Sequence, residues 1–134
     1  MNTRHEIGVI HGWFQVLHTD HLEYLLAGKR RCEHLVVGIT NPAPGLTRAD
    51  SADPGRSDPR SNPLTYFERY TLVRSVLTEA GAAEENFSVV PFPVTHPHLY
   101  ECYVPLSACF FLTIYDDWGR RKLETFRSLN LRTE

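Results

Sequence analysis

Short apolar runs alternate along this sequence with stretches of helical periodicity, and no other feature restricts the fold as strongly. The runs have the length of buried strands, whereas the periodic stretches place apolar residues three and four positions apart. Strands that alternate with helices in this way predict a parallel sheet with right-handed crossovers. The predicted strands span residues 6–11, 34–40, 87–90 and 108–115, and the predicted helices span residues 20–31, 64–80 and 118–129.

The pattern predicts one α/β domain over residues 1–134, built on a Rossmann-like, doubly wound parallel sheet. A hydrophobic content of 42% is enough for an ordinary globular core. We expect the second helix to end at Gly81 and the third strand to stop at Pro91.

Residues 41–63 interrupt the alternation. The segment is rich in proline and glycine, carries charges of both signs and has no periodicity. Loops of this length inside a compact domain are usually functional or disordered. We interpret the segment as a loop insertion, with a lid over the ligand and a passive surface segment as the two alternatives.

The charge balance and the cysteines limit the function classes. A formal net charge of −2 argues against a nucleic-acid partner or a polybasic membrane anchor. No apolar run approaches the roughly 20 residues that span a bilayer. The N-terminus leads directly into a strand pattern, so we expect no signal peptide. The cysteines are odd in number and lack a C-x-x-C spacing, so we expect buried free thiols in the cytoplasm. They are Cys32, Cys102 and Cys109.

Two histidines lie where the first predicted strand passes into the first predicted helix. Ligands of doubly wound sheets bind at the carboxyl ends of the strands, so His18 and His21 should face the binding crevice. Imidazole N–H groups and a helix N-terminus can hold phosphate oxygens, which is most of what nucleotidyl transfer requires of a protein. A metal pair, with His96 and His98 as further ligands, and plain surface histidines are the alternatives.

The segment GWFQVLHTDHL resembles the signature G-R-F-Q-P-x-H-x-G-H-L of the nicotinamide-mononucleotide adenylyltransferase family, within the HxGH superfamily. The resemblance continues along the chain. NPLT with the following Glu-Arg pair is similar to the family's N-P-F-T-x-x-E-R, FSVVPFP is similar to a strand followed by P-x-P, and YVP resembles an aromatic-V-P turn beside the acceptor. The residues that match the signature are Gly12, Phe14, Gln15, His18, His21 and Leu22.

The resemblance implies the HxGH nucleotidyltransferase fold and roles for individual residues. His18 and His21 would be catalytic, stabilising the transferring phosphate. No residue is assigned as a metal ligand, and Mg²⁺ is expected to accompany the bound nucleoside triphosphate. The residues implied in nucleotide binding are Gly12, Trp13, Phe14 and Gln15, and those implied in acceptor binding are Arg69 and Tyr103, with a structural ion pair as the alternative for Arg69.

The sequence also departs from the family. Trp13 replaces the signature arginine, and Asp20 replaces the glycine of HxGH. Val94 stands where the family often has an acidic residue near the nicotinamide end. The sequence ends at Glu134, before the family's S-x-T-x-I-R element, so we expect a C-terminally short fold.

Other cations must then bind the β- and γ-phosphates. Residues 120–122 open the last predicted helix at the ligand-binding edge, and guanidinium groups suit phosphate oxygens. A solvated helix face is the alternative reading of this basic cluster. The cluster consists of Arg120, Arg121 and Lys122, and the second candidates are Arg48, Arg56 and Arg60 of the loop insertion.

These features predict an enzyme that transfers a nucleoside monophosphate from a nucleoside triphosphate to a small phosphate or phosphonate acceptor and releases pyrophosphate. The short chain resembles the phosphonoformate cytidylyltransferases in size, which favours CTP over ATP. The first alternative is an ATP-dependent adenylyltransferase of nicotinamide-mononucleotide type, and the second is a nucleotide-binding module without turnover. The sequence leaves a homo-oligomer open.

Overall fold

Within the residues that the computed structural model describes, five strands form one parallel sheet. The described residues are 5–14, 19–40, 64–112, 117–129 and 131–133. The strand order is β3–β2–β1–β4–β5. The strands are β1 (His5–Gly12), β2 (Cys32–Thr40), β3 (Phe87–Phe92), β4 (Cys109–Phe111) and β5 (Arg132–Thr133).

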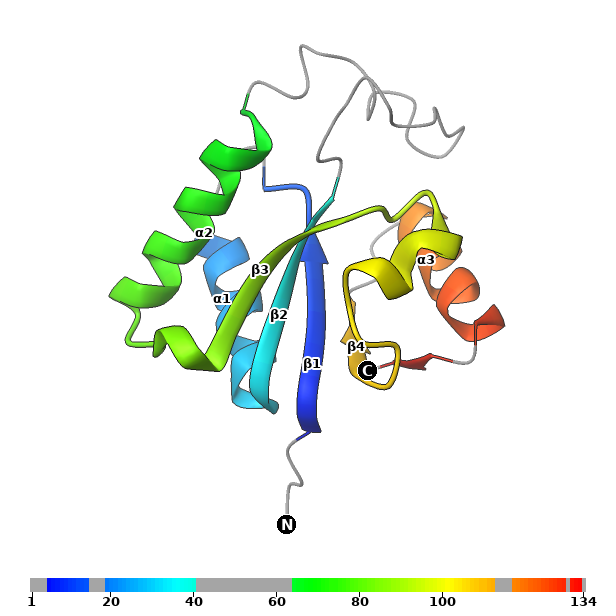
Figure 1. Ribbon diagram of the computed structural model, residues 1–134, viewed down its shortest axis with the longest axis horizontal. Helices are drawn as coiled ribbons and strands as arrows, with labels where there is room; N and C mark the ends of the chain where they lie inside the picture. The colour runs from blue at the N-terminus through cyan, green and yellow to red at the C-terminus, as the bar shows by residue number, and fades with distance from the viewer. Residues whose placement is uncertain (1–4, 15–18, 41–63, 113–116, 130, 134) are drawn as a thin grey trace.

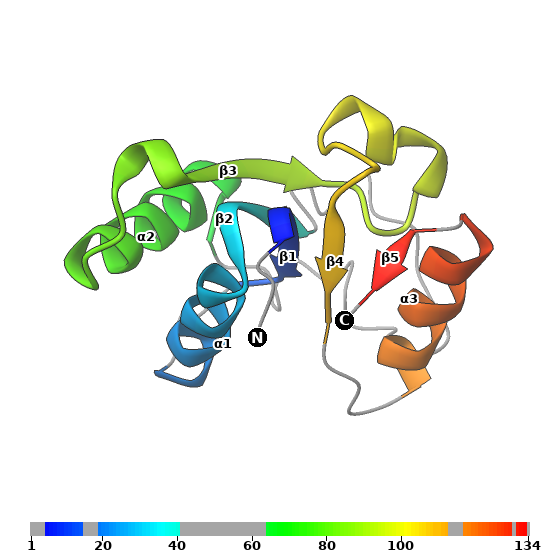
Figure 2. The same cartoon turned by 90° about the horizontal axis from the view of Figure 1, so that it is seen from below.

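Helices cover both faces of the sheet (Figure 1, Figure 2). From β1 the chain winds outward to β3 on one side, then crosses to β4 and winds outward to β5 on the other. This arrangement confirms the predicted Rossmann-like, doubly wound α/β fold. The helices are α1 (Thr19–Arg30) and α2 (Tyr66–Glu79) on one face and α3 (Asp117–Ser128) on the other; the short 3-10 segments are η4 (Glu84–Asn86) and η5 (Pro97–Cys102).

Successive strand residues supply two separate cores because side chains of a strand alternate between faces. Ile10 faces α1 and α2, whereas its neighbour Val9 packs on the side of η5 and α3. The core on the α3 side is strongly aromatic, and its rings lie 4.6–5.9 Å apart between centroids. These rings belong to Phe92, Tyr100, Phe110 and Phe126.

The third strand is longer than the sequence predicted. β3 continues through Pro91, which is in register with Ile39 of β2, and ends at Phe92. The expectation that Pro91 stops the strand was wrong. β3 lies at the edge of the sheet with β2 as its one neighbour, and proline is tolerated on an edge strand because its missing N–H can face outward.

The C-terminal part of the sheet was predicted less well. The described part of the predicted fourth strand is Cys109–Phe111, because residues 113–116 lie outside the described residues. β5 was not predicted, since two residues carry no detectable pattern. The predicted insertion at 41–63 also lies outside the described residues. In the part of the chain that is described, no helix is long and apolar enough to cross a bilayer.

Helix α2 begins with a capping box. The Thr65 side chain accepts a hydrogen bond from the Glu68 N–H at 3.1 Å, and the Glu68 carboxylate accepts one from the Thr65 N–H at 3.0 Å. The second bond holds the pKa of Glu68 below its usual value. Gly81 follows the helix with φ of 97°, a conformation that favours glycine, so the predicted helix end is confirmed.

Candidate functional site

The carboxyl ends of the strands meet at one edge of the sheet, where the direction of winding reverses between β1 and β4. Such a reversal leaves a crevice in which doubly wound proteins bind their ligands. The helix N-termini of α1, α2 and α3 lie toward this same edge (Figure 1). Their partial positive charge favours anionic groups there.

The chain leaves β1 through a compact turn at Gly12 and Phe14. A Cβ atom on Gly12 would lie 2.5 Å from Cζ of the Phe14 ring, a distance at which atoms clash. Phe14 has φ of 51°, and its side chain is only 2% exposed. A side chain at position 12 would therefore have to displace the Phe14 ring, which folds back over Gly12.

His21 lies in the first turn of α1 and is partly buried. Its ring meets the Phe14 ring edge-on, with 5.6 Å between centroids and an interplanar angle of 86°. The structure thus places His21 in the first turn of α1 with its ring against Phe14, and its predicted catalytic role stays a prediction. His18 and Gln15 lie outside the described residues, so their roles stay predictions.

Arg69 is completely buried in the first turn of α2. It donates hydrogen bonds to the backbone carbonyl oxygens of Trp13 at 3.0 Å and Thr40 at 2.7 Å. Burial lowers the pKa of its guanidinium, and the neighbouring Tyr66 partly opposes this shift. The structure ties Arg69 to the framework of the crevice, while acceptor binding by Arg69 stays a prediction.

His11 was missed by the sequence reasoning. It is 4% exposed and precedes Gly12 at the end of β1. Its ring packs against Phe92 at 5.5 Å and against Phe126 of α3 at 5.7 Å between centroids. A polar residue in the last positions of an apolar strand was the available signal.

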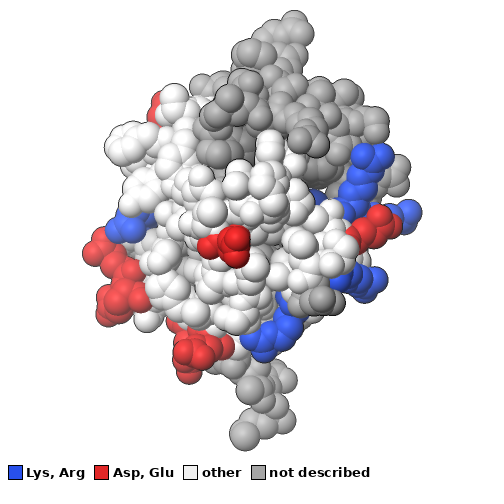
Figure 3. Space-filling model, turned by 45° about the vertical axis from the view of Figure 1, so that its right-hand side comes forward, with Lys and Arg blue, Asp and Glu red and all other residues white. Residues whose placement is uncertain are grey.

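The basic cluster of residues 120–122 lies in the N-terminal half of α3. Arg120 and Arg121 are exposed, and Lys122 is partly buried. Figure 3 shows Lys and Arg side chains gathered at one edge of the surface, on the side that carries α3 in Figure 1. Arg120 and Arg121 are therefore accessible to an anionic ligand. Binding of phosphates by the cluster stays a prediction.

The segment after β3 holds the remaining candidates. Tyr103 caps the C-terminal end of η5, and its side chain is 42% exposed. It is therefore accessible to an acceptor, and its predicted contact with the acceptor stays a prediction. The rings of His96 and His98 lie 6.0 Å apart, and His96 Nδ1 is 3.1 Å from Thr95 Oγ1. Among the described residues, no three His, Cys, Asp or Glu side chains come together as a metal site.

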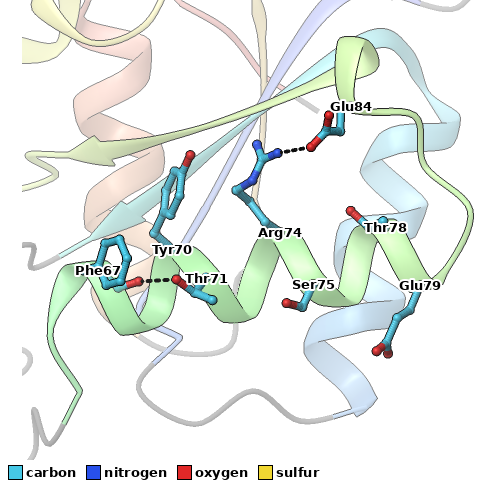
Figure 4. Close-up of a pocket in the computed structure, with 8 residues that line it drawn as sticks. All are labelled: Phe67, Tyr70, Thr71, Arg74, Ser75, Thr78, Glu79 and Glu84. Atoms are coloured by element: carbon cyan, nitrogen blue, oxygen red, sulfur yellow. Dashed lines mark hydrogen bonds and ion pairs between the residues drawn. The ribbon is translucent and has the colours of Figure 1, made fainter.

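A groove of about 460 Å³ runs along the outer face of α2 (Figure 4). Arg74 crosses it to form an ion pair with Glu84 at 2.5 Å and lies over the Tyr70 ring at 5.7 Å. Tyr70 in turn stacks on Phe67, which is 71% exposed. These contacts stabilise the surface of α2. The groove is separate from the crevice between β1 and β4, because α2 and Glu84 line it.

Two comparisons of the sequence with known proteins gave different outcomes. No protein-family profile matches the chain. The chain is 55% identical over 127 residues to a phosphonoformate cytidylyltransferase of Streptomyces viridochromogenes, covering 95% of this chain and 69% of that protein.

Solved structures show the same fold. A bifunctional NMN adenylyltransferase/ADP ribose pyrophosphatase from Francisella tularensis aligns with a TM-score of 0.68 at 15% identity, over 96% of this chain and 37% of that one. The same enzyme complexed with AMP and a manganese ion aligns with a TM-score of 0.66 at 13% identity, over 97% and 36%. The chain thus spans little more than a third of these structures. At this identity the likeness extends to the fold alone.

Proposed function

Since the chain belongs to the phosphonoformate cytidylyltransferase family of nucleotidyltransferases, we propose that it transfers CMP from CTP to a small phosphonate or phosphate acceptor and releases pyrophosphate. The observation that carries this proposal is 55% identity along 95% of the chain, which includes the crevice between β1 and β4. An acceptor resembling phosphonoformate follows from the relative's activity.

In the proposed reaction an acceptor oxyanion attacks the α-phosphorus of the nucleotide. A bond forms between the acceptor oxygen and phosphorus, and the bond from phosphorus to the bridging oxygen of pyrophosphate breaks. The acceptor is already ionised at neutral pH, so no side chain has to remove a proton. The protein instead holds the phosphates in line and stabilises the charge on the transferring group.

The residues at the crevice fit these requirements. The N-terminus of α1 offers N–H groups to phosphate oxygens, and His21 stands in that first turn against Phe14. We assign His18 and His21 to the transferring phosphate and the basic cluster of α3 to the β- and γ-phosphates. We also assign Gly12 to nucleotide binding on the family signature, while in the structure the Phe14 ring fills the space where a side chain of residue 12 would project.

A divalent cation fits the reaction as a companion of the nucleotide. The manganese complex of the structural neighbour supports such an ion, and Mg²⁺ is the usual partner of a triphosphate. Among the described residues, no three carboxylate, imidazole or thiolate groups come together as a metal site. When bound, the cation would neutralise charge on the phosphates.

We also propose a cytoplasmic location. Cys32, Cys102 and Cys109 are all free thiols, which suits a reducing compartment. Cys102 is exposed at the end of η5, so the expectation that all three thiols are buried was wrong for this residue. A thiol can be exposed there because η5 packs on the sheet through Tyr100.

Adenylyl transfer to nicotinamide mononucleotide is the second candidate, and the shared fold supports it. Val94 argues against it, because this residue is 7% exposed and packs in the apolar core beside Tyr100. An acidic contact to a nicotinamide group is therefore missing at this position.

Two measurements test the proposal. In thermal-shift assays with Mg²⁺, CTP should stabilise the protein more than ATP, GTP or UTP. Pyrophosphate should then be released from CTP only when phosphonoformate is added. Release from ATP with nicotinamide mononucleotide would establish the second candidate. Binding of a triphosphate without turnover on either acceptor would indicate a module that has lost catalysis.

A further inference from the structure

Arg69 is the largest of the fully buried side chains in the described part of the chain. Burying a cation is costly unless hydrogen bonds compensate it closely. The carbonyl oxygens around Arg69 provide this compensation, and charge-assisted bonds of this kind are stronger in a dry interior. Such an arrangement stabilises one geometry of the groups that it joins.

Those groups come from segments far apart in the sequence. Nη1 donates to Trp13 O in the turn after β1 and to Thr40 O at the end of β2. Nε donates to Thr65 O at 3.3 Å, at the N-cap of α2. One guanidinium thus joins the carboxyl ends of two adjacent strands to the start of the helix that follows them.

Through Trp13 and the adjacent Phe14, Arg69 is connected to His21. Trp13 precedes Phe14, whose φ of 51° requires support because a bulky residue rarely adopts it. The Phe14 ring packs edge-on to His21. A shift of the Trp13 carbonyl would therefore change the backbone of Phe14 and, through its ring, the orientation of the His21 imidazole.

We propose that Arg69 is a positioning residue for nucleotidyl transfer, which sets the turn after β1 and thereby the orientation of His21. This inference rests on the proposed reaction at the crevice and adds a role that the sequence did not assign. Arg69 acts through Trp13 and Phe14 and does not contact the acceptor. Its complete burial and its bonds to backbone oxygens support this role over direct binding of an anion.

The test compares Arg69→Met and Arg69→Lys with a control, Arg74→Met. Methionine keeps much of the apolar volume without a donor, while lysine keeps a cation with N–H donors. Arg74 lies on the same helix in a surface ion pair with Glu84, away from the crevice.

The first readout is the NMR signal of the His21 ring in the ligand-free protein. His34 serves as the internal reference, because its ring bonds with Ser88 Oγ at 2.8 Å and with Glu85 O at 3.1 Å. His21→Gln and His34→Gln variants assign the two rings. The second readout is kinetic: kcat, the KM for CTP and the KM for phosphonoformate.

We expect Arg69→Met to move the His21 signals, to leave those of His34 unchanged and to lower kcat by about ten- to a hundredfold, as misplaced groups typically do. Arg69→Lys should show smaller changes in the same direction, and Arg74→Met should show neither. If Arg69→Met fails to fold, the His21 signals and kcat of Arg69→Lys test the proposal.

Unchanged His21 signals in the folded variants, or a rise in the acceptor KM alone, would overturn the proposal in favour of direct acceptor binding. The NMR readout needs no substrate. If the parental protein does not react with CTP and phosphonoformate, the proposed function fails while the role of Arg69 is still decided.

Discussion

Phe14 adopts a left-handed backbone conformation although it carries a bulky side chain. Such a conformation costs on the order of 1–3 kcal/mol and is kept only where the surroundings determine it. Here the ring is buried over Gly12 and against His21. Strain of this kind gathers at functional sites, which agrees with a reactive crevice at the end of β1.

Gly12→Ala should disrupt this turn. The new methyl group would meet the Phe14 ring, which is 2% exposed and would have to shift within the core. We expect turnover to fall by at least about tenfold, since a displaced catalytic group easily costs that much. Pyrophosphate release measures it.

Gly81→Ala is the matched control. Gly81 also has a positive φ, but it has open space around it at the far end of α2. This variant should lose about 1–2 kcal/mol of stability from the left-handed conformation and keep its turnover. Full activity in Gly12→Ala would mean that the turn tolerates a side chain.

His18→Ala and His21→Ala should each lower turnover at least tenfold and leave the fold intact. Loss of a donor that stabilises developing charge typically costs about 2.7–4 kcal/mol of transition-state stabilisation. His98→Ala, at an exposed position in η5, is the control and should keep parental rates. Near-parental pyrophosphate release by both catalytic variants would refute the assignment.

At the scale of elements, helix α3 carries a basic cluster, whereas this sequence lacks the arginine of the family signature. Trp13 stands in place of the signature arginine, and its backbone is engaged by Arg69. A triphosphate nevertheless brings several negative charges, which one helix terminus and two histidines cannot balance. The N-terminal half of α3 carries a basic cluster in which Arg120 and Arg121 are exposed, and Figure 3 shows Lys and Arg side chains on that side of the molecule.

Arg120→Ala or Arg121→Ala should therefore weaken binding of CTP more than binding of CMP. The expected loss is about 1.5–3 kcal/mol for a charged hydrogen bond, measured by calorimetric titration of both nucleotides. Arg127→Ala, in the last turn of α3, is the matched control. Equal losses for CTP and CMP would move the phosphate contacts to the arginines of residues 41–63 or to a neighbouring chain.

At the scale of the whole molecule, the sheet separates two cores that support different parts of the crevice. The core beneath α1 and α2 includes Phe14, and the core beneath η5 and α3 holds Phe126 among aromatic rings. His11 contacts Phe126, so the end of β1 is also joined to α3. The crevice depends on both cores for the relative placement of its helices.

Phe126→Ala should lower the free energy of unfolding by about 3–5 kcal/mol, because it leaves a cavity among fully buried rings. Urea denaturation measures the loss. Phe67→Ala is the control at a position that is 71% exposed, and its effect should stay within about 0.5 kcal/mol. If Phe126→Ala lowers the free energy of unfolding no more than Phe67→Ala does, the aromatic core does not stabilise α3.

The sequence alone determined the alternation of strands and helices and the place of His21 at the first helix start. Hydrophobic periodicity is a local property of neighbouring side chains, so the main elements and the doubly wound sheet followed from it. The glycine at the end of α2 likewise followed from local capping geometry, whereas Gly12 was named from the family signature and its packing under the Phe14 ring came from the structure.

Only the tertiary structure decided which groups these elements bring together. The bonds of Arg69 to Trp13 and Thr40 join residues 56 and 29 positions apart, and no local pattern shows where a buried guanidinium points. Pro91 lies within a strand because β3 became an edge of the sheet. His11 acquired aromatic neighbours from β3 and α3 in the same way. Such contacts arise when distant segments pack, so their energies are invisible to any window of the sequence.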